Sequence, residues 1–357
     1  MKIGIMTFQE TTNYGALLQT MALQKAINMI GGESELIRYR CDEIVKRELP
    51  GSIFDDGFFH APISLLTRII QQRKYRKMES FKHKYCKLSE TEYDRSTIDS
   101  TLTKYDRFLV GSDIVWELNV TGGDTAFYLD FVDDPSLKYS FSSSFGYDHV
   151  PDQYLEVTKK LLSEFSMISV RENEGADIIQ NLLGKKELVT ADPTILLKAD
   201  SWRKYELPYP SLKDKDYILV YFDNDKGSAI AFAKKIAQAK GLKIAYIRNS
   251  LREIEGVKTI RDASVEQFLW LIDNAKIIVT GSYHGVLFSV NFNKEFYYVN
   301  RAHPGRINTI IDIAGIKNRD IMSDDITEEK IDWVTVNQRI DQFRDASLSR
   351  LKDIVET

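Results

Sequence analysis

The chain opens with a strand, a polar loop, a helix and a second strand, and this order constrains its fold more than any other feature. Residues 2–8 are apolar, and residues 16–30 place apolar side chains at helical spacing before Gly31 and Gly32. Another apolar segment, residues 34–39, follows at once. Because two strands joined through a helix are normally parallel, the sequence predicts a parallel α/β fold.

The same alternation continues in two runs separated by a break. Residues 198–216 lose their periodicity and have the proline-rich, charged composition of a linker. The first run predicts strands at 105–111, 139–145, 167–171 and 188–197 and helices at 154–165 and 172–183. The second predicts strands at 217–222, 242–247, 276–280 and 295–299, with helices at 228–239, from 264, at 283–290 and at 307–314.

These runs predict two Rossmann-like domains with a ligand cleft between them. The first domain covers residues 1–200 and carries a basic helical insertion at about 60–90, and the second covers residues 215–330. Residues 331–357 have apolar side chains three and four positions apart, which predicts an amphipathic C-terminal helix. We expect this helix to pack back on the domains, with a dimer contact as the alternative.

Charge and cysteine content exclude several classes of protein. The chain has 48 basic and 52 acidic residues and a net charge of -4, which argues against nucleic acid as a partner. Its two cysteines provide neither a disulfide framework nor a zinc site, and its carboxylates form no metal-ligand cluster. No signal peptide or membrane-spanning run is present. We therefore expect a cytoplasmic protein without a metal or cofactor.

His284 is the strongest candidate for a catalytic residue. It lies in the segment Ser282-Tyr283-His284-Gly285, directly after an apolar strand and at the start of a helix. In an open α/β sheet this is where ligands bind, and the helix N-terminus favours an anion. An imidazole there can transfer protons to a bound phosphoester. The alternative is a histidine that only caps the helix.

Two arginines occupy similar positions. Arg171 ends the strand at 167–171, where its guanidinium suits a carboxylate or a phosphate. The alternative for Arg171 is a salt bridge to Glu172 or Glu174. Arg306 precedes the helix at 307–314 and is a weaker candidate of the same kind.

Two polar loops after strand ends could also contribute to a ligand site. The first contains Asn13, Tyr14 and Gly15, and the second contains Ser112 and Asp113, with Trp116 close behind. Neither loop has a dinucleotide or P-loop pattern.

Taken together, these motifs resemble the polysaccharide pyruvyl transferases. The similarity rests on five motifs in family order between residue 1 and about residue 315, and any one of them alone is unspecific. They are Asn13-Tyr14-Gly15-Ala16 with Leu18-Gln19 and Ala22-Leu23, Gly111-Ser112-Asp113 with Trp116, Ser169-Val170-Arg171-Glu172, Asp192-Pro193-Thr194, and Ser282-Tyr283-His284-Gly285 with Phe288-Ser289.

This resemblance implies a two-domain GT-B arrangement, with an acceptor side in the first domain and a donor side in the second. It also implies transfer of pyruvate from phosphoenolpyruvate to a sugar diol of a bacterial surface or capsular polysaccharide repeat unit, with release of phosphate. His284 would be the catalytic residue and Arg171 a ligand of phosphoenolpyruvate. The other residues expected to bind substrate are Ser282, Tyr283, Gly285, Arg306, Asn13, Tyr14, Gly15, Ser112, Asp113 and Trp116.

This sequence departs from the family pattern at Ser282, where characterised members often have arginine. Arg306 or the amides at the helix N-terminus would replace that phosphate ligand, and a changed donor is the alternative. Two other functions stay open: a GT-B glycosyltransferase that uses a nucleotide sugar, and a non-catalytic sugar- or phosphate-binding module.

The insertion suggests a further partner. Residues 67–87 contain eight lysines and arginines and one acid, interleaved with apolar and aromatic side chains. Such a segment can lie on an anionic membrane surface, and a lipid-carrier-linked acceptor would favour peripheral attachment at the inner face. The alternative is a solvated helix packed on its own domain.

Overall fold

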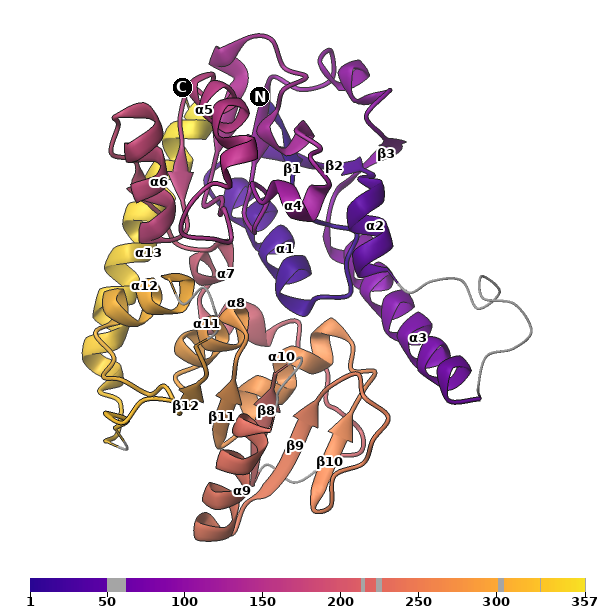
Figure 1. The fold of residues 1–357 in the computed structure, drawn as a ribbon, viewed down its shortest axis with the longest axis vertical. Coiled ribbons are helices and arrows are strands. Elements are labelled where there is room, and N and C mark those ends of the chain that lie inside the picture. Colours follow the sequence, from indigo (N-terminus) through magenta and orange to yellow (C-terminus); the bar gives the residue numbers. More distant parts are fainter. Residues whose placement is uncertain (50–61, 213–215, 223–226, 301–304, 328, 357) are drawn as a thin grey trace. The chain divides into compact units, whose positions relative to one another are not determined.

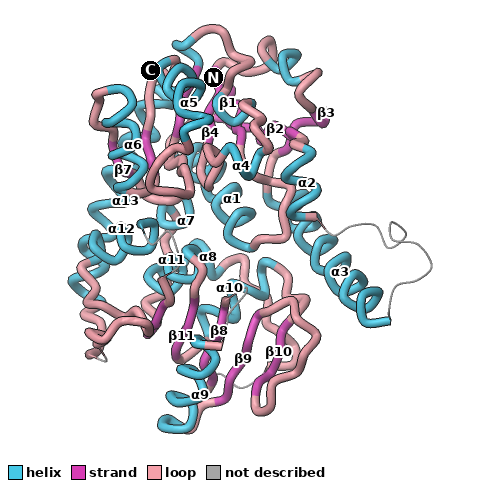
Figure 2. Tube along the Cα trace, in the orientation of Figure 1, coloured by secondary structure: helices cyan, strands magenta, loops and turns pink. Residues whose placement is uncertain are grey.

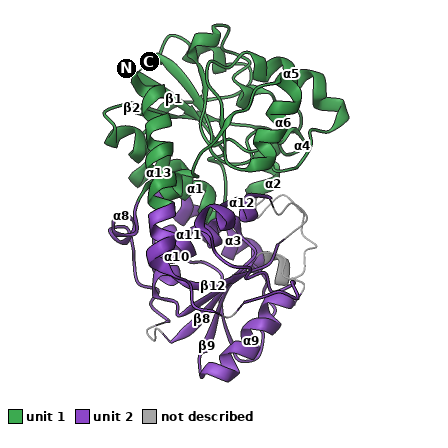
Figure 3. Cartoon of the chain, turned by 90° about the vertical axis from the view of Figure 1, so that its left-hand side faces the viewer, with its two compact units in different colours: residues 1–49, 82–197, 340–357 green, residues 50–81, 198–339 purple. Residues whose placement is uncertain are grey.

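The computed structural model describes the chain except residues 50–61, 213–215, 223–226, 301–304, 328 and 357 (Figure 1). It divides into two compact units (Figure 3). Unit 1 comprises residues 1–49, 82–197 and 340–357, and unit 2 comprises residues 50–81 and 198–339. Across the described residues, no helix is both long and apolar enough to cross a membrane.

Unit 1 is built on a parallel five-stranded sheet in the order β3-β2-β1-β4-β5. Strands β1 to β4 of this sheet are labelled in Figure 2. A short parallel pair, β6 with β7, accompanies it. The strands are β1 Lys2–Met6, β2 Glu33–Tyr39, β3 Leu88–Tyr93, β4 Arg107–Val110, β5 Lys138–Ser140, β6 Ser169–Val170 and β7 Leu188–Val189. The α-helices are α1 Tyr14–Met29, α2 Asp42–Glu48, α4 Leu118–Thr121, α5 Leu155–Ser163, α6 Asn173–Leu183 and α7 Pro193–Leu196, and short 3-10 helices lie at Ile98–Thr101, Ala126–Tyr128, Pro135–Leu137 and Asp152–Tyr154.

Unit 2 repeats this topology. Its parallel sheet has the order β10-β9-β8-β11-β12. The strands are β8 Tyr217–Tyr221, β9 Lys243–Ile247, β10 Val257–Ile260, β11 Ile277–Thr280 and β12 Glu295–Tyr298. The helices are α8 Ala199–Arg203, α9 Ser228–Lys240, α10 Val265–Asn274, α11 Tyr283–Asn291 and α12 Gly305–Ala314. The capping box predicted at Ser264 and Gln267 is present at the start of α10.

Both sheets reverse their strand order at an equivalent place. In unit 1 the chain adds β2 and β3 on one side of β1 and then β4 and β5 on the other. Unit 2 does the same around β8 and β11. The loops after β1 and β4, and those after β8 and β11, therefore meet at the switch point of their own sheet, which is the usual ligand position in such folds.

Two long helices have residues in both units. In α3 (Pro62–Tyr85), Lys77 Nζ donates to the carbonyl (2.5 Å) and the carboxylate (3.1 Å) of Asp262, while Lys82 Nζ lies 2.9 Å from Glu10 of unit 1. The sequence placed the insertion at 60–90 in the first domain, and its first residues lie outside the described ones. In the structure, residues 62–81 group with unit 2, because side chains such as Lys77 contact that unit.

The other long helix is α13, Trp333–Glu356. Residues 340–357 group with unit 1, where Ser347 Oγ accepts a hydrogen bond from the Ala191 amide (2.8 Å) and Arg344 Nε donates to the Ile195 carbonyl (2.6 Å). Ile340 and Leu351 are buried. The amphipathic C-terminal helix thus packs on unit 1 through residues 340–357.

Two predicted strands are wrong in part. The strand expected at 188–197 stops after β7, because the Asp192 side chain accepts a hydrogen bond from the Thr194 amide and starts α7. The strand expected at 139–145 ends at Ser140, since Ser142 has a positive φ of 54° and leaves the extended conformation.

Candidate functional site

At the switch point of unit 1, the loop after β4 is shaped by Gly111. This residue has a φ of 122°, and a Cβ on it would lie 2.1 Å from the Phe141 carbonyl oxygen, so only glycine fits. Ser112 is fully enclosed: its amide donates to Gln19 Oε1 (3.2 Å) and its hydroxyl to the Ser142 carbonyl (2.9 Å). Ser112 therefore holds the loop in place and does not face an open surface.

Asp113 is the more open member of this loop. It has a positive φ of 81°, and its side chain is 14% exposed. One carboxylate oxygen accepts from the Ile114 amide (2.9 Å) and lies 3.7 Å from Arg171 Nη2. Of the two polar residues predicted in this loop, Asp113 is the one that can reach a ligand.

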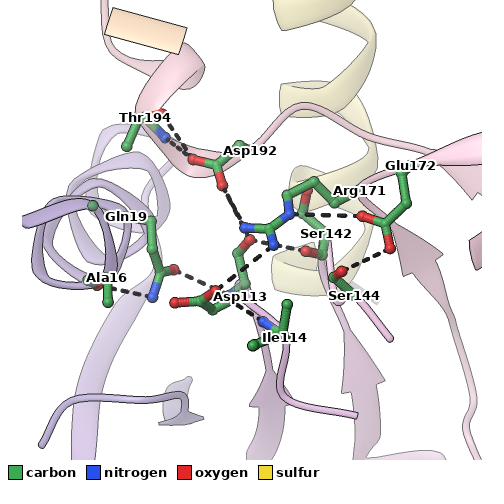
Figure 4. A network of polar contacts seen from close by, with 12 residues as sticks. Ala16, Gln19, Asp113, Ile114, Ser142, Ser144, Arg171, Glu172, Asp192 and Thr194 are labelled. Carbon is green, nitrogen blue, oxygen red and sulfur yellow. Dashed lines mark hydrogen bonds and ion pairs between the residues drawn. The ribbon is translucent and has the colours of Figure 1, made fainter. Parts of the chain in front are cut away.

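Arg171, at the end of β6, is surrounded by carboxylates (Figure 4). Its guanidinium lies 3.1 Å from Asp192, 3.7 Å from Asp113 and 3.7 Å from Glu172, and the Arg171 side chain is 0% exposed. The salt bridge to Glu172 that the sequence left as an alternative is therefore present. We call Arg171, Asp113, Glu172 and Asp192 the Arg171 network. Its three carboxylates and one guanidinium give it a formal charge of -2. Such a network is better suited to holding the Asp113 loop, the segment 111–113 after β4, than to binding an anion directly.

The surrounding hydrogen bonds fix each member of this network. Asp192 Oδ1 accepts from the Thr194 amide (3.0 Å) and hydroxyl (2.7 Å), which ties Arg171 to α7. Glu172 Oε1 accepts from the Ser144 hydroxyl (2.7 Å). The sequence motifs contained Asp192 but assigned it no role. The serine-rich stretch at 140–144 was the available signal that this region is internally hydrogen bonded.

The loop after β1 provides the start of α1. Asn13 is exposed and its side chain accepts a hydrogen bond from the Gly15 amide (2.9 Å), so it caps the 16-residue helix. Tyr14 and Gly15 are buried. Of these three predicted residues, the exposed Asn13 is the one at the surface.

The structure corrects the prediction for Trp116. Its side chain is 0% exposed and belongs to the core of unit 1. The indole stacks on Tyr128 with ring centroids 5.7 Å apart, and its Nε1 donates to the Phe127 carbonyl (3.1 Å). Trp116 therefore stabilises the fold beneath the Asp113 loop and is not a ligand contact.

At the switch point of unit 2, β11 passes through Gly281 and Ser282 into α11. The Ser282 side chain accepts a hydrogen bond from the Gly285 amide at 3.4 Å, and the Ser282 amide donates to Thr280 Oγ1 at 3.0 Å. Thr280 Oγ1 in turn donates to the Tyr221 carbonyl (2.7 Å). This chain of bonds fixes the direction in which α11 leaves the sheet.

Glycine is required at two positions of this turn. A Cβ on Gly281 would lie 1.6 Å from the Phe222 ring, and a Cβ on Gly285 would lie 2.3 Å from Thr280 Oγ1. The backbone of α11 consequently approaches the strand ends more closely than any other residue would allow.

His284 is in the first turn of α11 and is 6% exposed. Its ring meets that of Tyr283 edge to face, with centroids 5.3 Å apart. The Arg306 guanidinium, in the first turn of α12, lies 6.0 Å from the Tyr283 ring. The predicted residues Ser282, Tyr283, His284, Gly285 and Arg306 are thus brought together in one unit, with an imidazole, a guanidinium and the amide end of a nine-residue helix. This combination can bind an anionic group and exchange a proton with it.

Known proteins that are similar to this chain indicate its family and its fold. Residues 13–303 match the family described as polysaccharide pyruvyl transferase. No curated protein matches the sequence significantly. UDP-GlcNAc 2-epimerase from Neisseria meningitidis, solved with UDP-GlcNAc, is similar in structure, with a TM-score of 0.52 and 12% identity over 100% of both chains.

Two further solved structures are similar over nearly their whole length. They are the UDP-GlcNAc 2-epimerase of Methanocaldococcus jannaschii (TM-score 0.50, 11% identity, 98% of both chains) and an alpha-glucosyltransferase in complex with UDP and a 13-mer DNA (TM-score 0.50, 10% identity, 99% of this chain and 95% of that one). Enzymes of these kinds have the GT-B fold, and the predicted GT-B fold is therefore confirmed.

Proposed function

The chain belongs to the polysaccharide pyruvyl transferase family, and on that premise we propose that it transfers pyruvate from phosphoenolpyruvate to two hydroxyls of a saccharide. The product is a pyruvate ketal on a bacterial surface or capsular polysaccharide repeat unit, and phosphate is released. The observation that carries this proposal is the position of His284, in the first turn of α11 and directly after β11 at the switch point of unit 2.

The reaction needs a proton donor and a proton acceptor. One sugar hydroxyl adds to C2 of phosphoenolpyruvate while C3 gains a proton, and a second hydroxyl displaces phosphate from C2. A positioned histidine assists such transfers by about 10²- to 10⁴-fold. His284 supplies this group in the proposal. It gives the proton to C3 and recovers one from the first attacking hydroxyl, and the proton of the second hydroxyl leaves with the phosphate.

Phosphate binding falls to α11 and Arg306 in this proposal. Ser282 is too short to replace the arginine that characterised members often have here. The Ser282 hydroxyl orients the first turn of α11 through the Gly285 amide (3.4 Å), and the other amides of that turn carry the positive end of the helix dipole. Arg306, next to Tyr283, adds a full positive charge.

Unit 1 is assigned the acceptor. Asp113 is partly exposed at the end of β4, and its carboxylate can accept a hydrogen bond from a sugar hydroxyl. Arg171 is enclosed and lies 3.7 Å from the Asp113 carboxylate, so it can orient that side chain. We assign Arg171 a positioning role, and the competing role is direct contact with phosphoenolpyruvate.

A nucleotide-sugar glycosyltransferase is the second candidate, because the similar solved structures include an alpha-glucosyltransferase in complex with UDP. One experiment separates the candidates. The protein is incubated with a saccharide and either phosphoenolpyruvate or a UDP-sugar, and the release of phosphate or UDP is followed. Phosphate release with ketal formation supports pyruvyl transfer, UDP release supports glycosyl transfer, and binding without release supports a non-catalytic module.

Attachment to an anionic membrane at the inner face, through residues 67–87, is a further part of this proposal. Arg73, Arg76 and Lys84 are exposed on α3 and offer positive charge to lipid. Lys82 is buried and paired with Glu10, so it does not contribute. Membrane contact would bring the enzyme to an acceptor carried on a lipid.

A further inference from the structure

Unit 1 contains an open cavity of about 620 Å³ that neither the Arg171 network nor the Asp113 loop lines. Its walls come from three segments, Tyr39–Glu43, Asp94–Ser96 and Thr121–Thr125. The first two begin at or directly after the carboxyl ends of the neighbouring parallel strands β2 and β3, and the third lies in the connection after β4. The cavity therefore opens at the ligand-binding edge of the sheet, and its volume is within the range of about 300–1,000 Å³ typical of small-molecule sites.

Two consecutive glycines shape the third wall. Gly122 and Gly123 have φ values of 65° and 85° and form the left-handed turn that ends α4. A Cβ on Gly122 would lie 2.4 Å from Glu43 Cγ. Glycine here allows the turn to approach the start of α2, which brings Asp124 over the cavity.

The carboxylates of the cavity are oriented before any ligand arrives. Asp124 accepts hydrogen bonds from the Tyr39 hydroxyl (2.5 Å) and the Ala126 amide (3.0 Å). Burial and the Asp124 carboxylate raise the pKa of Tyr39, so its phenol stays protonated and continues to donate. Asp94 receives hydrogen bonds at Oδ1 from the Ser96 amide (2.9 Å) and hydroxyl (2.6 Å). These contacts fix the two acceptors without the cost of ordering them on binding.

An equally fixed donor lies beside them. Arg95 makes a two-bond contact with Asp130, with both N–O distances 2.7 Å, and Asp130 also accepts from the Thr125 hydroxyl (2.5 Å). The Arg95 side chain is still 55% exposed. A carboxylate and a guanidinium side by side match neighbouring sugar hydroxyls, because each hydroxyl can donate to one and accept from the other.

The charge of the lining selects the kind of sugar. Four acids, Asp42, Glu43, Asp94 and Asp124, face two arginines, Arg40 and Arg95, which leaves a formal charge of -2. Anionic ligands such as uronic acids or phosphates are disfavoured by this charge. We propose that the cavity binds a neutral monosaccharide unit of the acceptor. The assignment of this sugar to the acceptor rests on the proposed function. The assignment of a neutral sugar to the cavity rests on the cavity alone.

The test is direct binding of simple glycosides to the full chain. The probes are the methyl glycosides of glucose, galactose, mannose and N-acetylglucosamine, with methyl glucuronide as the anionic member, followed by saturation-transfer NMR. At least one neutral glycoside should bind better than the glucuronide. Asp124→Asn and Asp94→Asn each keep the side-chain shape but replace a carboxylate oxygen with an amide group. Either change should weaken binding about tenfold, the loss expected when a hydrogen bond to a charged group is removed.

Glu92→Gln is the matched control, since Glu92 is an exposed acid on β3 outside the cavity and should leave glycoside binding unchanged. Thermal unfolding confirms that each variant is folded. Because Asp94 is exposed, its variant tests the site even if Asp124→Asn unfolds. The proposal is overturned by equal binding in the parent and a folded Asp94 variant, by absence of binding for every neutral glycoside, or by preference for the glucuronide.

Phosphate release from phosphoenolpyruvate by the parent is measured in parallel. Release combined with unaltered glycoside binding in the Asp94 and Asp124 variants would refute the sugar site and leave the function standing. Absence of release would refute pyruvyl transfer, whereas the glycoside measurement would still decide the cavity.

Discussion

The guanidinium of Arg171 lies 3.1 Å from the carboxylate of Asp192, and neither side chain is exposed at all. This contact joins the end of β6 to the start of α7, because Asp192 also caps α7 through the Thr194 amide. The Asp113 carboxylate lies 3.7 Å from Nη2 of the same guanidinium. A single buried cation thus contacts the loop after β4, in which the Asp113 carboxylate is partly exposed at the switch point.

Arg171→Met should destabilise the fold by about 3–5 kcal/mol, because it leaves Asp113, Glu172 and Asp192 without their shared cation. Arg171→Lys should cost less stability but should lower kcat more than it raises KM for phosphoenolpyruvate, since a lysine cannot hold three carboxylates at once. Urea unfolding and steady-state kinetics measure these effects.

Arg38→Lys is the control for this experiment, because Arg38 makes a partly exposed pair whose change should cost under about 1 kcal/mol. A large rise in KM for phosphoenolpyruvate with unchanged kcat in Arg171→Lys would instead assign Arg171 to direct donor binding.

Gly285→Ala should reduce both stability and activity. The added methyl would lie 2.3 Å from Thr280 Oγ1, so Thr280 must give up its bonds to the Tyr221 carbonyl and the Ser282 amide. Overpacking of this kind costs about 1–3 kcal/mol. Gly175→Ala in α6 is the comparison, because its nearest contact would be 3.2 Å away. Equal melting temperatures for the two variants would show that the turn before His284 adapts without strain.

We expect Glu206 to make the stability of the folded protein depend on pH. Burial, followed by the neighbouring Asp273 carboxylate, raises the pKa of Glu206 to about 7. The folded state therefore keeps a proton that the unfolded state releases near pH 4.5, and this group lowers the free energy of unfolding as pH rises from about 4.5 to 7. The Glu206→Gln variant cannot titrate at this position, so it lacks this decrease in the free energy of unfolding.

The stability advantage of Glu206→Gln over the parent should therefore grow between pH 5 and pH 8, as measured by urea unfolding at several pH values within that range. Glu255→Gln, at an exposed acid, is the control and should show no such trend. A difference between Glu206→Gln and the parent that stays constant with pH would contradict the raised pKa.

The proposed membrane attachment depends on exposed cations of α3. Changing Arg73, Arg76 and Lys84 to glutamine should release the protein from anionic vesicles, since each cation near the lipid contributes on the order of 1 kcal/mol. Co-sedimentation at low and high salt measures this. The control changes exposed Lys234 and Lys235 of α9. Recovery of the parent in the supernatant with every vesicle would leave α3 as a solvated helix.

Much of the fold follows from sequence periodicity, because buried parallel strands and amphipathic helices leave clear patterns. The strands that were not predicted, β3 and β10, are both at sheet edges. β3 has the polar sequence Leu-Ser-Glu-Thr-Glu-Tyr, and β10 has only four residues, so neither shows a buried apolar run. Edge strands pair on one side only, and hydrogen bonding rather than burial defines them.

The candidate site was less predictable than the fold. His284 and its neighbours form one short segment, and the rule that ligands bind at strand ends locates them without knowledge of tertiary contacts. Arg171 meets Asp113 and Asp192, which are 58 and 21 positions away along the chain, and only the pairing of strands brings them together. Trp116 was misjudged because an indole near a polar loop has the same sequence signature whether it faces the core or a ligand.

The central claim concerns His284 and is tested by phosphate release from phosphoenolpyruvate in the presence of a saccharide acceptor. The parent should release phosphate and form a pyruvate ketal, detected by mass spectrometry of the acceptor. His284→Gln should reduce the rate by at least about 10²-fold. Glutamine is chosen because His284 is only 6% exposed and alanine would leave a void. The free energy of unfolding of His284→Gln should stay within about 1 kcal/mol of that of the parent. His149→Gln, at a side chain that is 80% exposed, should retain full activity. Phosphate release by a folded His284→Gln variant at the parental rate would contradict the account.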